Sequence, residues 1–178
     1  MVKLIGIILA FAGCTAVGFL KASDLRQREK LLLDFKDLLL HISTEISYFK
    51  EPLPQIFDRL SVECCKEGSG SDSETGLLLR NCLTAYRTEG VDMDRLWKNA
   101  VDFVYEDLPV TQRDMDIMKK CGDFLGQSDF AGQQEHFLML NHQLDRQIEQ
   151  AARAADTKGK MYSRLGISAG AVLAIVLI

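Results

Sequence analysis

The chain has 178 residues, of which 47% are hydrophobic and 26% are charged, a composition typical of one folded domain and not of a disordered chain. Its charges are unevenly placed, because all 25 acidic residues and all but two of the 21 basic residues lie between residues 21 and 160. This acidic middle segment lacks the clustered Lys and Arg that bind nucleic-acid phosphates, so nucleic acid is not an expected partner.

The two ends of the chain are apolar and long enough to cross a bilayer. Residues 4–20 carry no charge and residues 161–178 carry only Arg164, which gives about 26 Å and about 27 Å of helix. We therefore predict transmembrane helices at 1–20 and 161–178 around a cytoplasmic helical domain at 21–160. A buried helix is the alternative for the second segment, but that segment ends on AVLAIVLI without a polar residue.

Cys14 raises another alternative for the first segment, because it ends the sequence FAGC, which resembles a lipoprotein processing site. A processed leader turns polar after the lipidated cysteine, whereas here the apolar run continues to Leu20. A lipoprotein with an external helical domain is therefore the less favoured reading.

Small side chains recur every four residues in both apolar ends, at Gly6, Ala10, Cys14 and Gly18 in the first and at Gly166, Gly170 and Ala174 in the second. This spacing places them on one face of each helix, and small faces let helix backbones approach closely in lipid. We expect these residues to form the packing contact between the two membrane helices.

Basic residues flank the inner side of both apolar ends. Lys21, Arg26, Arg28 and Lys30 follow the first, and Arg153, Lys158, Lys160 and Arg164 lie before or at the start of the second. The positive-inside rule then places the middle segment in the cytoplasm and both termini across the membrane. The same residues are expected to contact anionic lipid headgroups.

The middle segment is predicted to be all-α, with a long helix at each end. No Gly or Pro interrupts residues 21–51 or 133–158, and apolar residues at steps of three and four give each segment one apolar face. Both helices lead to the same membrane, so we expect them to pair as an antiparallel two-helix stalk that carries a helical bundle.

Shorter helices are expected between these two. Pro52 and Pro54 end the first long helix and start another, and residues 68–76, GSGSDSETG, form a loop. Further helices are predicted at 77–86, 93–105 and 110–125, the last with Thr111 as its N-cap and Asp114 three residues on.

Catalytic and metal-binding motifs are missing from the sequence. His41, His136 and His142 lack the four-residue spacing of helical metal ligands, and neither a P-loop nor a GxSxG motif occurs. We therefore expect no enzyme activity, no cofactor, no metal and no small-molecule substrate. The five cysteines include no CxxC and indicate reduced thiols; a membrane thiol enzyme that uses Cys121 or Cys64 is the alternative.

Two polar features are candidate partner sites. Glu45 lies on an apolar helix face, where a charge is costly unless it is paired or hydrogen-bonded. A carboxylate bonded to a helix end or paired internally is therefore favoured over a partner contact. The sequence FLGQSD at residues 124–129 is read first as a helix stop at Gly126 with a cap at Ser128 or Asp129. The candidate partner-binding residues are Glu45, Pro52, Leu53, Gly126, Gln127 and Asp129.

Several segments together resemble a known family. The start KLIGIILAFAGCTAVGF, the stretch EISYFKEPLPQIFDRL, the helix around Trp97, and above all FLGQSD followed by GQQEHFLMLNHQL are similar to the stage III sporulation protein AB family of endospore-forming bacteria. The resemblance covers nearly the whole chain.

The resemblance implies a mother-cell membrane protein in the channel complex that links mother cell and forespore. It also implies a cytoplasmic fold similar to the F-type platform protein of type II secretion and type IV pilus systems. The implied partners are a cytoplasmic ATPase and other channel subunits, besides membrane lipid. An F-like inner-membrane component of a secretion or pilus system is the alternative.

Overall fold

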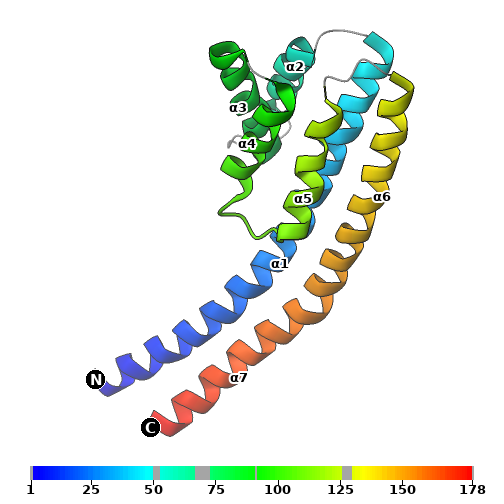
Figure 1. The fold of residues 1–178 in the computed structure, drawn as a ribbon. Helices are drawn as coiled ribbons and strands as arrows, with labels where there is room; N and C mark the ends of the chain where they lie inside the picture. The colour runs from blue at the N-terminus through cyan, green and yellow to red at the C-terminus, as the bar shows by residue number, and fades with distance from the viewer. Residues whose placement is uncertain (1, 50–52, 67–72, 91, 126–129, 178) are drawn as a thin grey trace. The chain divides into compact units, whose positions relative to one another are not determined.

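The computed structural model describes the backbone of residues 2–49, 53–66, 73–90, 92–125 and 130–177. All regular secondary structure in these residues is helical, which confirms the all-α prediction. The helices in chain order (Figure 1) are α1 Val2–Phe49, α2 Leu53–Lys66, α3 Glu74–Glu89, α4 Met93–Tyr105, α5 Gln112–Lys120, the 3-10 helix η1 Gly122–Phe124, α6 Phe130–Ala154, the π-helical turn η2 Ala155–Gly159 and α7 Lys160–Leu177.

The two predicted transmembrane helices are not shown by this structure. Within the part of the chain whose side chains it describes, we find no helix with an apolar stretch sufficient to traverse a bilayer. The side chains of residues 1–5, 7 and 10 in the first predicted span and of 177–178 in the second lie outside that part.

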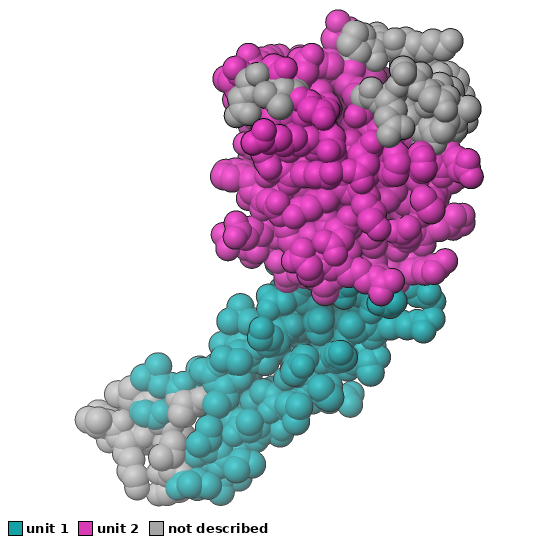
Figure 2. All heavy atoms as spheres, viewed as in Figure 1, with its two compact units in different colours: residues 1–30, 148–178 teal, residues 31–147 magenta. Residues whose placement is uncertain are grey.

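The chain forms two compact units (Figure 2). Unit 1 contains residues 1–30 and 148–178, and unit 2 contains residues 31–147. The helices α1 and α6 therefore each contribute to both units. These limits describe compactness, and the predicted divisions after residues 20 and 160 stay predictions.

The core of unit 2 forms on the apolar face of α1. Leu32, Phe35, Leu39 and Ile42 are spaced by three or four residues and are buried, which confirms the predicted stripe over this stretch. The other helices of the unit cover the stripe with the buried side chains Ile56, Phe57, Leu60, Leu78, Leu79, Leu96, Trp97, Val101, Tyr105, Met118, Phe137, Leu140 and Leu144.

Aromatic rings lie at the centre of this core. The Phe35 ring centroid is 6.3 Å from that of Trp97 and 6.4 Å from that of Tyr105, and Phe57 lies 5.8 Å from Trp97 on the same measure. The indole nitrogen of Trp97 donates to the Met118 carbonyl at 2.9 Å. The cluster therefore joins α1, α2, α4 and α5 and satisfies the one polar group of the indole.

Helix ends follow local hydrogen-bonding signals. The Thr111 hydroxyl accepts from the Asp114 amide at 3.3 Å, and the Asp114 carboxylate accepts from the Thr111 amide at 2.8 Å, so the predicted cap of α5 is confirmed as a capping box. Ser73 caps α3 in a similar way, because its hydroxyl accepts from the Gly76 amide at 3.2 Å. Gly90 ends α3 with φ of 59°, a left-handed conformation that glycine adopts without strain.

Several predicted boundaries were wrong. The loop predicted at 68–76 ends at Ser73, because that cap starts α3 at Glu74. The helix predicted at 110–125 ends at Lys120, and a 3-10 turn follows it. Gly122 in this turn packs so closely on α4 that an added Cβ would lie 3.0 Å from both the Asp94 carboxylate and the Trp97 ring. The helix predicted at 133–158 starts at Phe130 and loses its α-helical form after Ala154.

The aromatic core gives a direct stability test. Phe35 is 1% exposed and Phe103 is 74% exposed, so the same truncation should be strongly destabilising at Phe35 and nearly neutral at Phe103. Phe35→Ala should lower the free energy of unfolding by about 3–5 kcal/mol, whereas Phe103→Ala should change it by less than about 0.5 kcal/mol. Denaturant titration followed by far-ultraviolet circular dichroism measures both, and equal losses would contradict the assignment of the core.

Candidate functional site

The backbones of α1 and α7 touch in unit 1. An added Cβ at Gly18 would lie 2.7 Å from the Tyr162 carbonyl oxygen and 3.0 Å from the Gly166 Cα. An added Cβ at Gly166 would lie 3.0 Å from the Cys14 carbonyl oxygen and 3.1 Å from the Gly18 Cα. Because these neighbours are backbone atoms that no side-chain motion can move, only glycine permits this approach at both positions.

The remaining small residues are placed differently along the same pair of helices. An added Cβ at Gly170 would lie 2.9 Å from the Phe11 ring, so this glycine also lies at the contact. Gly6 faces open space, with no atom within 4 Å of an added Cβ. Ala174 is half-buried, and the side chain of Ala10 lies outside the described residues.

The π-helical turn η2 keeps the C-terminal helix in contact with α1. Ala151, Ala155 and Gly159 are all buried, although steps of four residues rotate an α-helical face by about 40° each. The wider π turn from Ala155 to Gly159 absorbs this drift, and an added Cβ at Gly159 would lie 3.9 Å from the Ala22 Cβ, an ordinary contact. The four-residue spacing of the small residues Ala151, Ala155 and Gly159 is the sequence pattern from which this turn could have been predicted.

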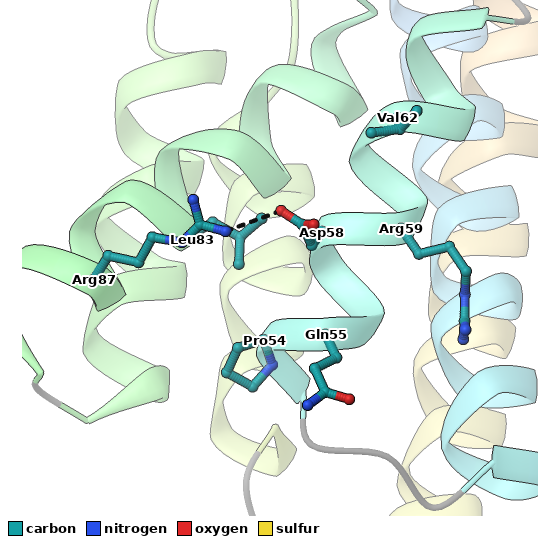
Figure 3. A pocket seen from close by; sticks show the side chains of 7 residues that line it. All are labelled: Pro54, Gln55, Asp58, Arg59, Val62, Leu83 and Arg87. Atoms are coloured by element: carbon teal, nitrogen blue, oxygen red, sulfur yellow. Dashed lines mark hydrogen bonds and ion pairs between the residues drawn. The ribbon is translucent and has the colours of Figure 1, made fainter.

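A hollow of about 480 Å³ lies on the α2 and α3 surface of unit 2. It is lined by Pro54, Gln55, Asp58, Arg59, Val62, Leu83 and Arg87 (Figure 3). Arg87 of α3 donates to the Asp58 carboxylate at 3.0 Å, and these side chains are 69% and 62% exposed. Val62 is exposed beside them. The hollow thus combines an accessible ion pair with an apolar wall, the chemistry of a protein contact.

Glu45 is paired inside unit 2. Arg59 of α2 donates to its carboxylate, and Figure 3 shows the Arg59 side chain extending away from Asp58 and Arg87. The Glu45 side chain is 19% exposed, so the pair compensates a largely buried charge. An internal pair is one of the arrangements that the sequence favoured for Glu45. This pair joins α2 to α1.

Leu53 is the only other candidate partner residue that the structure describes; it is half-buried and starts α2. Pro52, Gly126, Gln127 and Asp129 lie outside the described residues. Their role as partner-binding residues stays a prediction. The hollow on α2 and α3 was not found from the sequence, because Asp58 and Arg87 are 29 residues apart and meet only when the two helices pack.

Other polar groups of unit 2 serve the fold. The Lys98 Nζ lies 2.5 Å from the Asp123 carboxylate and 2.8 Å from the Asp94 carboxylate. Its hydrogen bonds, first to Asp123 and second to Asp94 in size of effect, raise its pKa to about 12. The ring of His136 stacks on Phe124 with centroids 3.9 Å apart. Among the residues described, no three metal-ligating side chains are grouped closely enough to hold a metal ion.

Two described thiols are unsuited to nucleophilic chemistry. Cys82 and Cys121 are fully buried, and burial raises the pKa of Cys82 to about 12. Burial, and to a smaller extent the negative charge of Asp123, also raise the pKa of Cys121. Both thiols stay protonated at neutral pH, and the thiolate is the reactive form. Cys121 therefore does not suit the thiol-enzyme alternative, and the Cys64 side chain lies outside the described residues.

The glycine contact predicts an asymmetric response to one substitution. Gly18→Leu should separate α1 from α7, whereas Gly13→Leu adds the same side chain where no atom lies within 4 Å. Disulfide crosslinking between cysteines introduced at Phe19 and Ser163, which line one hollow, should fall several-fold only for Gly18→Leu. Equal crosslinking in the two variants would show that the backbones do not meet at Gly18.

The buried thiols predict conformation-dependent labelling. Iodoacetamide at neutral pH should modify Cys82 and Cys121 only after denaturation, since both are buried and protonated in the fold. Mass spectrometry of the digested protein measures the extent at each position. Rapid modification of Cys121 in the folded chain would restore the thiol-enzyme alternative.

Comparisons with known proteins agree with the helical architecture. A solved structure described as stage III sporulation protein AB has the same fold, with a TM-score of 0.63 over 73% of this chain and 97% of that chain at 18% identity. The stage III sporulation protein AB of Bacillus subtilis (strain 168) is 23% identical over 178 residues, which cover 99% of each chain. The family described as stage III sporulation protein AB matches residues 3–178. The chain therefore belongs to the stage III sporulation protein AB family.

Proposed function

We propose that this sporulation protein is a membrane-anchored platform or adapter without enzyme activity, in the channel complex between mother cell and forespore. Its ends would lie in the mother-cell membrane, with the middle segment in the cytoplasm. The observation that carries the proposal is the antiparallel pairing of the two apolar ends, with many apolar side chains left exposed. Among them, Ile175 and Val176 of α7 are 72% and 76% exposed, which a lipid environment would favour and water would not.

The helix pairing also argues against the lipoprotein alternative. Lipidation at Cys14 requires cleavage before that residue, which would remove Phe11. A Cβ added at Gly170 would lie 2.9 Å from the Phe11 ring and 3.2 Å from the Phe11 carbonyl oxygen, so cleavage would delete one of the contacts that join α1 to α7. An F-like component of a secretion or pilus system is a related alternative, with the same anchoring and a different assembly.

The cytoplasmic partner in this proposal is an ATPase of the same complex, which the platform would couple to the channel. Unit 2 offers the hollow on α2 and α3 as a contact surface, because its Asp58–Arg87 pair is accessible and sits beside exposed Val62. A partner loop could exchange its own charges with this pair and cover the valine. The α2 helix also begins at Leu53, one of the residues predicted to meet the partner.

A charge swap separates recognition from stability. Asp58→Arg and Arg87→Glu each break the ion pair, and the double variant restores it with reversed polarity. If the ATPase recognises these charges, the double variant should capture it several-fold less well than the unchanged chain. All three variants should unfold within about 0.5 kcal/mol of the unchanged chain, because both side chains are exposed.

Co-purification of the full-length chain with the ATPase measures this effect. The matched control is the exposed Glu149–Arg153 pair of α6, where the same swap should leave capture unchanged. Full capture by the Asp58/Arg87 double variant would show that the ATPase contact lies elsewhere. The double variant Asp129→Lys with Gln127→Lys would then test two of the other candidate partner-binding residues. Failure of the unchanged chain to capture the ATPase would contradict the coupling role.

A further inference from the structure

A second hollow lies in the groove between α1 and α7, entirely within unit 1. Its volume is about 550 Å³, and it is lined by Ala16, Phe19, Leu20, Ala22, Ser23 and Arg26 of α1 and by Ser163 of α7. The close backbone approach at Gly18 and Gly166 brings the two walls together. No carboxylate lines this hollow.

The lining changes from apolar to basic along α1. Phe19 and Leu20 are 54% and 64% exposed, and Ser23 and Arg26 follow on the same helix. The six residues from Leu20 to Arg26 advance about 9 Å along the axis, which is on the order of the thickness of the interfacial layer of a bilayer. The groove therefore presents an apolar end and a cationic end at the separation found within one phospholipid.

Polar side chains with unused hydrogen-bonding capacity also line this hollow. No residue that the structure describes forms a hydrogen bond or an ion pair with Arg26, or with the hydroxyl groups of Ser23 and Ser163. By contrast, the nearby Lys21 lies 3.7 Å from Asp24. A guanidinium presents a planar set of donors that matches two oxygens of a phosphate. Ser23 lies three residues before Arg26 on the same face of α1, so its hydroxyl can donate to the same phosphate.

We propose that this groove binds one anionic phospholipid, with its phosphate at Arg26 and Ser23 of α1 and an acyl chain along Phe19 and Leu20, beside Ser163 of α7. The proposal rests on the membrane anchoring of the proposed function. A free phosphate would satisfy Arg26 equally well but would leave the two exposed apolar side chains uncovered. The bound lipid would bridge α1 and α7 beside the glycine contact and so stabilise the helix pair.

Arg95 on α4 of unit 2 supplies a matched control. It is exposed, and Arg95→Gln makes the same change of charge as Arg26→Gln at a position outside unit 1.

The test is lipid-dependent stabilisation of the full-length chain in a neutral detergent. Phosphatidylglycerol should raise the melting temperature in a saturable way, and phosphatidylcholine should not. Arg26→Gln should weaken the apparent affinity for phosphatidylglycerol about tenfold, since it removes charge-assisted hydrogen bonds to the phosphate. Arg95→Gln should change it by less than about twofold. Circular dichroism without lipid checks that each variant is folded.

Three results would overturn the inference: an unchanged response in Arg26→Gln, an equal loss in Arg95→Gln, or the same stabilisation by glycerol phosphate, which lacks acyl chains. Vesicle flotation distinguishes a failure of the proposed membrane anchoring from a failure of the proposed lipid site. A chain that does not float with vesicles of pure phosphatidylcholine contradicts the anchoring. A chain that floats with them and shows no preference for phosphatidylglycerol contradicts only the lipid site.

Discussion

The close approach of α1 and α7 is the constraint on which the rest of the structure depends. Gly18 and Gly166 meet backbone to backbone, with no room for a side chain on either, and the contact joins the two ends of the chain in antiparallel order. The intervening residues must then leave along α1 and return along α6. The helices α2 to α5 are therefore built as an insertion between two long helices, and their apolar faces pack on the part of α1 that belongs to unit 2.

This arrangement favours binding over catalysis. Among the residues of unit 2 whose side chains the structure describes, Cys82 and Cys121 are buried and protonated, and Glu45 is paired with Arg59. The accessible chemistry lies on surfaces, as an ion pair beside a valine on α2 and α3 and as unpaired donors in the groove of unit 1. Both are suited to holding another molecule in place, which is the role expected of a platform.

Local signals in the sequence predicted the helices well. The bounds of α4 at Met93 and Tyr105 and the cap at Thr111 follow from residues within a few positions of each other, and the stripe from Leu32 to Ile42 has a clear helical period. The hollow at Asp58 and Arg87 and the Glu45–Arg59 pair depend on how helices pack, which a local pattern does not encode. The π turn at Ala155–Gly159 was missed because residues 133–158, which no Gly or Pro interrupts, were read as one regular α-helix.

The central claim of the proposed function is that both ends cross one membrane while the middle segment faces the cytoplasm. Site-specific labelling with a membrane-impermeant thiol reagent tests it most directly in a chain whose own cysteines are replaced by alanine. A cysteine at Arg95, which is exposed on α4, should react only after lysis, whereas a cysteine added after Ile178 should react in intact cells. Labelling of the Arg95 position in intact cells would place the domain outside and contradict the account.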